Sequence, residues 1–563
     1  MHVRQLPSEL QQALDVVAHN DAEFRINSRG FERPLLLEVI READMVGYAR
    51  AFDPKRRIPG APNHLDLVWL GLAHAIDLLA PEAMRGPGIA WQPATPEHTA
   101  WAMGFLRRAA LASHFRRLTE LLRYELSAIE VLGPGSFRFH ILAEDLEARD
   151  RDALDWFAGR MRSDQSHLLR AFHELHGDAI TAELKARVGS DPTFGIRYSS
   201  SRELEECFEF EAELRAATLP GNDCLPESAR LGPLTFGDFR KIVVAGMGRS
   251  LKHAAFVQTL LAHEPKAPPT ALTIFADERI LKDEWGGLLD LDDATSAVVL
   301  DAIGLTPADL PELRRTGDCP QALLIRGGDT FWHEPVYAGL NNPFGWVTSK
   351  LRRMFRSDWD RAVEGREAQF RDDLRALFPE PRFWFAPTPL KIRAAGRVLT
   401  DIDAIVIDRD CGTLAAFQLK WQDTFQNGLA ERESRRRNLI KEGNAWIGVL
   451  SDYCAGCNPN AAAARLGVPT AEAKDVRAFR PFVLTRNSAQ FSGPQEQDRA
   501  AAWLSWFDLL QRCHGVRQKT DPLSKIWRAA RRKRSSPVTS DLGMFEIDGI
   551  RVEIAQAPAV LKF

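Results

Sequence analysis

An acid, an amide and a lysine are spaced along TDIDAIVIDRDCGTLAAFQLKW, the segment over residues 400–421. Side chains on a β-strand alternate between its two faces, so a first strand would carry Asp403 among apolar residues. After a turn, a second strand would carry Gln418 and Lys420 on one face. If the two strands pair, a carboxylate, an amide oxygen and an ammonium group converge. These groups suit metal-assisted hydrolysis of a phosphodiester, because oxygen ligands hold the cation that the reaction needs.

The strands are expected over residues 401–407 and 414–421, joined by turn residues that include Gly412. Both faces of the first strand are largely apolar, which predicts a central strand in a sheet covered by helices. Asp403 would then be an acid inside a core, where an unpaired charge costs on the order of several kcal/mol. We expect this acid and the lysine to compensate each other, a metal ion, or both. Asp401 lies on the same face as Asp403 and could substitute for it.

A third acid, Glu367, lies upstream in a segment with the apolar spacing of a helix, over residues 357–378. Asp358 is a candidate N-cap for this helix. The apolar residues recur every three or four positions, at Trp359, Val363, Phe370, Leu374 and Leu377. Because Glu367 falls within this stripe, the helix is expected to present one buried carboxylate to the sheet, with the site at Asp403 as its nearest partner.

A helical Glu, a strand Asp and a Gln-x-Lys on the next strand resemble the PD-(D/E)xK restriction-endonuclease-like nucleases. The Gln-Leu-Lys-Trp ending is most similar to the variant in type IV restriction-type enzymes, where glutamine replaces the second acid. The chain lacks the proline of the PD-(D/E)xK motif, because Ile402 precedes the aspartate. The resemblance covers about residues 351–515.

The resemblance implies roles for five residues. Asp403 would be the principal ligand of Mg²⁺ or Mn²⁺, with Gln418 and the backbone carbonyl of Leu419 completing the protein's share. Lys420 would orient or activate the attacking water and stabilise the charge that develops on phosphate. Glu367 would be an outer or second-metal ligand. Because Gln418 brings no negative charge, metal binding would depend chiefly on Asp403.

The fold class expected is α/β and multidomain, with four regions along the 563 residues. Residues 1–200 are expected to be mainly helical, with helices over 35–52, 65–79, 98–122 and 153–175. Residues 201–350 are expected to be a mixed α/β domain ending in a linker over 326–350, with strands over 241–245, 271–276 and 322–326. Residues 351–515 would form the nuclease-like α-β-β-α-β-β-α core around a central mixed sheet. Residues 516–563 would be a basic segment and a β-hairpin.

Within the nuclease-like region, further elements are expected after the strand that ends at Lys420: a helix over 423–442, strands over 445–450 and 479–485, and a helix over 500–511. The final hairpin is predicted by Asp548-Gly549 between alternating apolar residues, and it is expected to dock on a neighbouring domain or pair with a sheet edge. In the middle region, KIVVAGMGRSLKHAAF predicts a strand, a turn at Gly246 and Gly248, and a helix. A nucleotide cradle at these glycines is an alternative, but the third glycine of that motif is missing and a simple turn is favoured.

The net charge of −3 gives no overall sign of nucleic-acid binding, so any such contact must come from local basic patches. Two arginine-rich segments could contact phosphates, and a solvated basic linker is an equal alternative for the second. Their candidate residues are Arg435, Arg436, Arg437, Arg528, Arg531, Arg532, Lys533 and Arg534.

Neither a leader sequence nor an apolar run long enough for a membrane span is present, so we expect a cytoplasmic protein without a membrane partner. Seven scattered cysteines predict reduced thiols. The function expected is Mg²⁺-dependent hydrolysis of nucleic acid, of DNA rather than RNA by the resemblance, in restriction or phage defence. The alternative is an inactive nuclease fold that binds nucleic acid or protein. An assembly of identical chains is left open.

Overall fold

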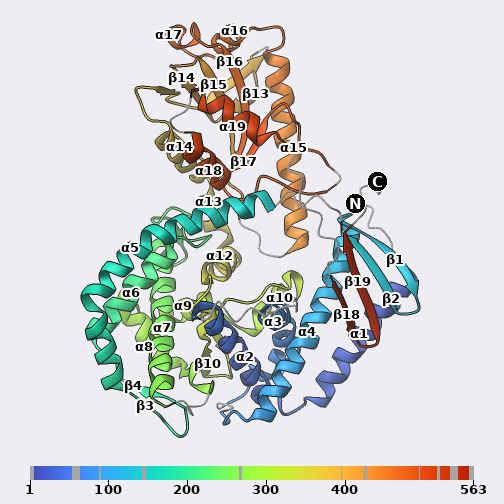
Figure 1. Cartoon of the computed structure of the whole chain (residues 1–563), viewed down its shortest axis with the longest axis vertical. Helices are drawn as coiled ribbons and strands as arrows, with labels where there is room; N and C mark the ends of the chain where they lie inside the picture. Colours follow the sequence, from blue (N-terminus) through green and yellow to red (C-terminus); the bar gives the residue numbers. More distant parts are fainter. Residues whose placement is uncertain are drawn as a thin grey trace.

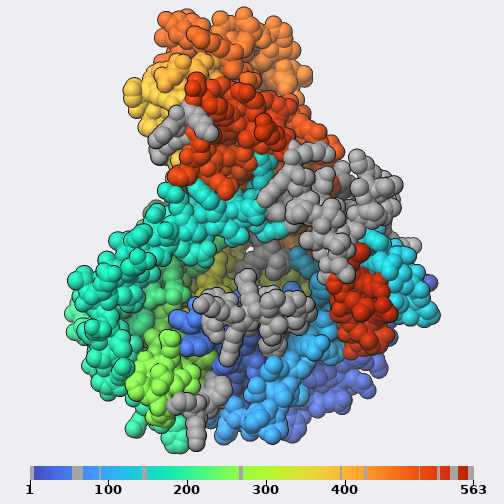
Figure 2. Space-filling view, in the orientation of Figure 1, coloured from blue at the N-terminus to red at the C-terminus, as the bar shows by residue number. Residues whose placement is uncertain are grey.

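The computed structural model describes residues 6–52, 64–87, 91–141, 148–264, 269–394, 396–423, 428–493, 495–516, 520–532 and 543–556. The chain is a mixed α/β protein, as predicted. Figure 1 shows two parts, a large body built from residues 6–363 and a C-terminal unit built from residues 366–532. In the space-filling view the C-terminal unit is a separate lobe that rests on the body (Figure 2). None of the described helices combines the length and apolar character that crossing a bilayer requires.

The body is mainly helical, and one hydrophobic cluster within it runs from Leu36 to Trp359. The four N-terminal helices predicted from apolar spacing are confirmed as α2, α3, α4 and α5. Its helices are α1 (Ser8–Asn27), α2 (Glu32–Phe52), α3 (His64–Ala83), α4 (Pro96–Arg123), α5 (Ala148–Arg187), α6 (Arg202–Ala216), α7 (Phe236–His263), α8 (Glu278–Leu289), α9 (Asp293–Ile303), α10 (Leu310–Thr316), α11 (Val336–Gly339), α12 (Pro343–Met354) and α13 (Arg356–Val363), with short 3-10 turns η1 (Pro269–Leu272) and η2 (Pro307–Asp309).

A small sheet within the body has the order β7-β10-β9-β8. Its strands are β7 (Ile274–Asp277), β8 (Gly304–Leu305), β9 (Leu324–Arg326) and β10 (Phe331–Glu334), and two hairpin-like pairs, β3 (Val188–Gly189) with β4 (Arg197–Tyr198) and β5 (Arg230–Leu231) with β6 (Leu234–Thr235), lie outside it. The strands predicted over 271–276 and 322–326 are confirmed in β7 and β9. The expected linker over 326–350 is wrong, because this segment supplies β10, α11 and much of α12 and buries Trp332 and Tyr337 in the core.

The strand predicted over 241–245 is also wrong. This segment and the two glycines after it belong to one long helix, α7, which begins at a capping box between Thr235 and Asp238. Both glycines are buried where other parts of the chain approach the helix. A Cβ on Gly246 would lie 2.6 Å from a methyl carbon of Leu323, and one on Gly248 would lie 3.2 Å from the carbonyl oxygen of Phe208. Close packing against α6 and the β9 region therefore explains the glycines without a bound nucleotide.

Replacing Gly248 with valine is expected to destabilise the body by about 2 kcal/mol, because the branched side chain would press on the backbone of α6. The thermal unfolding midpoint would report this loss. A nucleotide added to the wild type should give no stabilisation that depends on Gly248. A valine variant as stable as the wild type would contradict the close contact between α6 and α7.

The chain's last described strands return to the body. The hairpin predicted at Asp548-Gly549 is confirmed as β18 (Gly543–Ile547) and β19 (Ile550–Gln556), with both turn residues at positive φ. The hairpin adds to β1 (Ser127–Gly133) and β2 (Ser136–Ile141), in the order β1-β2-β19-β18, through parallel pairing of β19 with β2. In Figure 1 this sheet packs beside α4, with the red hairpin against the light-blue strands.

The C-terminal unit is built around a five-stranded mixed sheet in the order β11-β14-β15-β16-β17. Strands β11, β14 and β15 pair antiparallel, whereas β15, β16 and β17 pair parallel. The bounds are β11 (Phe383–Phe385), β14 (Ala404–Asp408), β15 (Thr413–Lys420), β16 (Ala478–Thr485) and β17 (Ala502–Ser505), and a separate hairpin, β12 (Leu390–Ala394) with β13 (Arg397–Ile402), precedes β14. The predicted pairing of the two strands around Gly412 is confirmed.

Helices cover both faces of this sheet, as the apolar faces of β14 predicted. On one face lie α15 (Leu429–Tyr453), α16 (Pro459–Arg465) and α17 (Thr470–Ala473). The other face is covered by α14 (Arg366–Leu377), α18 (Trp506–Val516) and α19 (Pro522–Ala530). The strand predicted over 445–450 is wrong, since these residues continue α15. The helix predicted over 500–511 begins later than expected, because residues 502–505 form β17.

The N-terminus of α5 ties the body to the C-terminal unit. The buried carboxylate of Asp150 accepts hydrogen bonds from the backbone N–H groups of Ala489 (2.8 Å) and Gln490 (2.9 Å). Next to it, Arg149 donates to the carbonyl of Ala530 at 2.6 Å. The first turn of α5 is therefore fixed to the lobe that carries the predicted site.

Candidate active site

Asp403 lies at a bend between β13 and β14, so the single strand predicted over 401–407 is in fact two strands. Its N–H donates to the carbonyl of Phe417 at 3.0 Å, which extends the pairing of β14 with β15 by one residue. The side chain is 7% exposed. One carboxylate oxygen, Oδ2, accepts from the backbone N–H of Leu419 (2.6 Å) and from Nε2 of Gln418 (2.5 Å).

Burial raises the pKa of Asp403 to about 7. The hydrogen bond from the Leu419 N–H opposes this rise, because it favours the ionised form. The negative charges of Asp401 and Glu367 raise the pKa further, and the ammonium of Lys420 lowers it. The site thus gathers negative charge that a proton, or a cation, would neutralise.

Strand β15 positions the other predicted groups. Gln418 and Lys420 share the face covered by α15, while Phe417 and Leu419 pack on the opposite face, as predicted. The carbonyl of Lys420 accepts from the N–H of Arg486, beyond the end of β16, at 2.9 Å. Carbonyl directions alternate along a strand, so the carbonyl of Leu419 points to the other side, toward Asp403. This is the orientation that a backbone metal ligand at Leu419 requires.

Lys420 has an ion-pair partner that the sequence did not suggest. Its Nζ lies 3.0 Å from Oε2 of Glu442 on α15, and the two side chains are 24% and 56% exposed. An ion pair this exposed contributes at most about 1 kcal/mol. The ion pair between Lys420 and Glu442 is therefore weak, and another anion can replace Glu442 beside the lysine with little loss of free energy.

Glu367 is exposed, which contradicts the buried position predicted for it. The predicted single helix is broken at Glu364 and Gly365 into α13 and α14, and Asp358 lies inside α13, where it accepts from the N–H of Gly232 at 2.8 Å. Phe370 and Leu374 of the predicted stripe are buried, but Val363 belongs to the helix before the break. Arg366 shares the buried face of α14 in place of Glu367. Glu367 still acts on Asp403 electrostatically from the first turn of α14.

Asp401 is exposed at the end of β13, and its backbone carbonyl accepts from Nε1 of Trp446 at 2.8 Å. Among the residues that the structure describes, no three His, Cys, Asp or Glu side chains come together as a metal cluster. Mg²⁺ needs no such cluster, because it is held by one or two carboxylates and keeps several waters. The buried carboxylate of Asp403, with the oxygens of Gln418 and Leu419, fits a hard cation of this kind.

The arginines predicted to contact nucleic acid differ in their exposure. Arg436 is buried and pairs with Glu433 at 2.6 Å, whereas Arg437 is exposed on the same helix. Arg435 is half-buried and faces the body. On and after α19, Arg528, Arg531 and Arg532 are exposed, and Arg531 lies 3.9 Å from the ring centre of Trp527. Lys533 and Arg534 lie outside the described residues.

Two residues near the site were not predicted. Glu442 occupies an exposed position in a polar helix, and nothing in its local sequence distinguishes it from neighbouring charges. Arg371, one turn after Glu367 on α14, donates to the carbonyl of Ala386 at 2.7 Å and interacts electrostatically with Asp403. Its spacing of four residues from Glu367 was the available signal, since residues i and i+4 share a helix face.

No family model, curated protein or solved structure matched the chain.

Proposed function

We propose that the chain is a metal-dependent nuclease that hydrolyses DNA phosphodiester bonds, with Mg²⁺ or Mn²⁺ held at Asp403, Gln418 and Leu419. One observation chiefly supports this: a buried carboxylate in a field of other acids, held by its neighbours on β15, with a lysine at the end of that strand. The choice of DNA over RNA, and a setting in restriction or phage defence, follow from the resemblance to type IV restriction-type enzymes. Glu367 would act as an outer ligand.

Each residue of the site would have a separate role in the reaction. Hydrogen bonds from Leu419 and Gln418 fix one carboxylate oxygen of Asp403, which leaves its other oxygen to bind the cation. The bound cation would polarise the phosphate and lower the pKa of a water. Lys420 would exchange Glu442 for the substrate phosphate, orient the attacking water and stabilise the charge that develops on the phosphate oxygens.

Substituting Lys420 with methionine is expected to slow DNA cleavage about 100-fold, because the variant cannot stabilise that charge. Supercoiled plasmid, single-stranded DNA and RNA would be incubated with the full chain and Mg²⁺ or Mn²⁺, and the initial rates compared. Lys441→Met is the matched control, since this lysine is exposed beside Glu442 and should be dispensable. If the wild type cuts none of the substrates with either metal, the nuclease proposal fails.

The Lys420–Glu442 pair favours one alternative, an inactive nuclease fold that binds nucleic acid. That alternative predicts DNA binding that is independent of Mg²⁺ and no cleavage by the wild type. Binding measured by fluorescence anisotropy with and without Mg²⁺, beside the cleavage assay, separates the two.

A further inference from the structure

A pocket of about 90 Å³ lies where the body meets the C-terminal unit. The body contributes residues from α10 and α12, among them Glu312 and Arg352. The C-terminal unit contributes Trp421 and Asp423 after β15, and Arg435 on α15. A ligand in this pocket would contact both parts of the molecule at once.

Three arginines from three helices surround one carboxylate at this pocket. Arg352 of α12 lies 3.0 Å from Oδ2 of Asp423, and Arg366 of α14 donates to its Oδ1. Arg435 of α15 interacts electrostatically with the same carboxylate and is repelled by the other two arginines. Glu431 also attracts Arg435, but it accepts a hydrogen bond from Arg315 at 2.8 Å. Arg352 and Arg366 are thus paired with Asp423, whereas Arg435 has no ion pair with a carboxylate among the described residues. The lining of the pocket also includes the acids Asp223, Glu312, Asp318 and Glu431.

Two of these guanidinium groups have buried nitrogens without a hydrogen-bond partner among the described residues. One is Nε of Arg435, which lines the pocket. The others are Nε and Nη2 of Arg366, whose guanidinium lies 5.8 Å from the ring centre of Trp421 and does not line the pocket. Burial lowers the pKa of Arg435, and Arg352 lowers it further, whereas Asp423 raises it. An unsatisfied buried donor on a charged group is costly, and an oxyanion in the pocket would satisfy that of Arg435.

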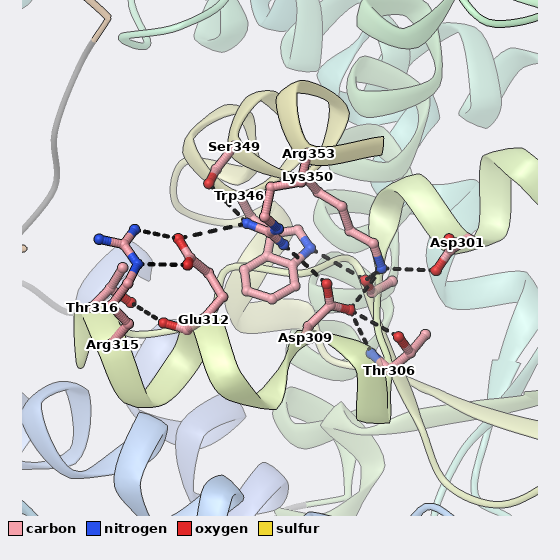
Figure 3. Close-up of polar contacts among 11 residues, drawn as sticks. Asp301, Thr306, Asp309, Glu312, Arg315, Thr316, Trp346, Ser349, Lys350 and Arg353 are labelled. Carbon is pink, nitrogen blue, oxygen red and sulfur yellow. Dashed lines mark hydrogen bonds and ion pairs between the residues drawn. The ribbon is translucent and has the colours of Figure 1, made fainter. Parts of the chain in front are cut away.

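Aromatic rings and a rigid wall complete the pocket. Trp346, Trp359 and Trp421 line it. Figure 3 shows the body wall, in which Arg353 of α12 lies 2.9 Å from Asp309, and Asp309 also binds the buried Lys350 at 2.7 Å. The charges in these ion pairs balance one another, so this wall shapes the pocket without adding net charge to it.

On the opposite side of the pocket, the charge of Arg486 is balanced by two acids. Its guanidinium pairs with Asp373 at 2.7 Å and with Asp223. It also lies over the ring of Trp421, with 4.7 Å between the guanidinium carbon and the ring centre. The charge of Arg486 is therefore already neutralised, which leaves Arg435 as the arginine of the lining without an ion pair among the described residues.

We propose that this pocket binds a free nucleotide, with a phosphate group at Arg352 and Arg435 and the base against the tryptophan rings. Arginine suits phosphate because its planar fork can donate two hydrogen bonds, and tryptophan suits a base because both have flat π faces. The enclosed position between two parts of the chain suits a small ligand rather than a duplex. Nucleotide binding would couple the body to the C-terminal unit that carries Asp403.

Isothermal titration calorimetry on the full chain, in metal-free buffer, tests this with ATP, AMP, adenosine and inorganic phosphate. The wild type is expected to bind ATP or AMP at least about 10-fold more tightly than adenosine or inorganic phosphate. Arg435→Gln should weaken nucleotide binding about 10-fold or more, because it removes a charged donor to phosphate. Arg437→Gln, the same change two residues along and exposed to solvent, should leave the Kd within about 2-fold.

Thermal unfolding separates a ligand-binding role from a structural one. Without ligand, Arg435→Gln should unfold at the same temperature as the wild type or higher, since it removes a repelled, partly buried charge. With ATP, the wild type should gain stability and Arg435→Gln should not.

The proposal would be overturned by any of three results: no nucleotide binding at millimolar concentration, unchanged binding by Arg435→Gln, or a ligand-free Arg435→Gln much less stable than wild type. Binding of an oligonucleotide but no mononucleotide through Arg435 would overturn it in favour of a nucleic-acid strand, and equal binding of inorganic phosphate in favour of a simple anion site.

Discussion

Asparagine at position 403 is expected to reduce DNA cleavage by at least about 1000-fold while DNA binding stays within a few-fold of the wild type. Asparagine has nearly the same shape and can still accept the hydrogen bonds from Leu419 and Gln418 that the aspartate accepts. It lacks the negative charge on which cation binding depends, because Gln418 brings none. Initial cleavage rates and anisotropy binding curves, measured on the same preparation, give the two readouts.

The same substitution is expected to stabilise the fold at high pH. The pKa of Asp403 is raised from 3.8 to about 7 by burial, so the folded protein keeps a proton that the unfolded chain releases near pH 4. Below about pH 4 this raised pKa costs the fold no stability, and the free energy of unfolding then falls as the pH rises to about 7. Above pH 7 the ionised Asp403 lowers the free energy of unfolding by at most about 4 kcal/mol, and Asp403→Asn avoids this loss. Urea unfolding at pH 4.5 and pH 8 should show the variant's advantage growing with pH.

Asp401→Asn is the control, since this acid is exposed and its charge reaches the site only through space. It should cut DNA at a rate near that of the wild type, and its difference in stability from the wild type should be nearly the same at the two pH values. Mg²⁺ at pH 8 should stabilise the wild type and Asp401→Asn but not Asp403→Asn. If Asp403→Asn cut DNA as fast as the wild type, the catalytic role proposed for Asp403 would be wrong.

The local geometry around Asp403 was predictable because it depends on the period of two residues along neighbouring strands. The alternation of side chains along a strand predicted which residues of β15 share a face, and the turn residues around Gly412 predicted the pairing of β14 with β15. The final hairpin was predictable for the same reason, from Asp548-Gly549. Its partner strand was not, because β2 lies more than 400 residues earlier in the chain and no local pattern encodes that pairing.

Predictions failed where tertiary contacts overrule local preference. The apolar run before Gly246 is compatible with a strand, but α7 continues through both glycines because other segments need to approach it closely there. The position of Glu367 was wrong because Glu364 and Gly365 interrupt the helix, so its spacing from Val363 across the break does not show which side of α14 it lies on. The arginine cluster at Asp423 joins three helices, so spacing along any one of them could not reveal it.

Replacing Gly443 with alanine is expected to destabilise the C-terminal unit by about 2–3 kcal/mol, although alanine is the better helix former. A Cβ at this position of α15 would lie 2.3 Å from a ring carbon of Trp503 on β17. That ring is buried and its Nε1 donates to the carbonyl of Asp498 at 2.9 Å, so it has little freedom to move aside. The helix itself would have to shift, taking Glu442 and Arg435 with it.

Gly448→Ala supplies the matched control, because it makes the same change on the same helix, at a position with open space around the new methyl group. Here only helix propensity acts, so the variant should be more stable than the wild type by about 0.5–1 kcal/mol. Thermal unfolding should therefore give shifts of opposite sign, with a fall of roughly 4–12 °C for Gly443→Ala. Shifts of the same sign would mean that α15 does not pack closely on Trp503, and the positions of Glu442 and Arg435, which depend on that packing, would have to be revised with it.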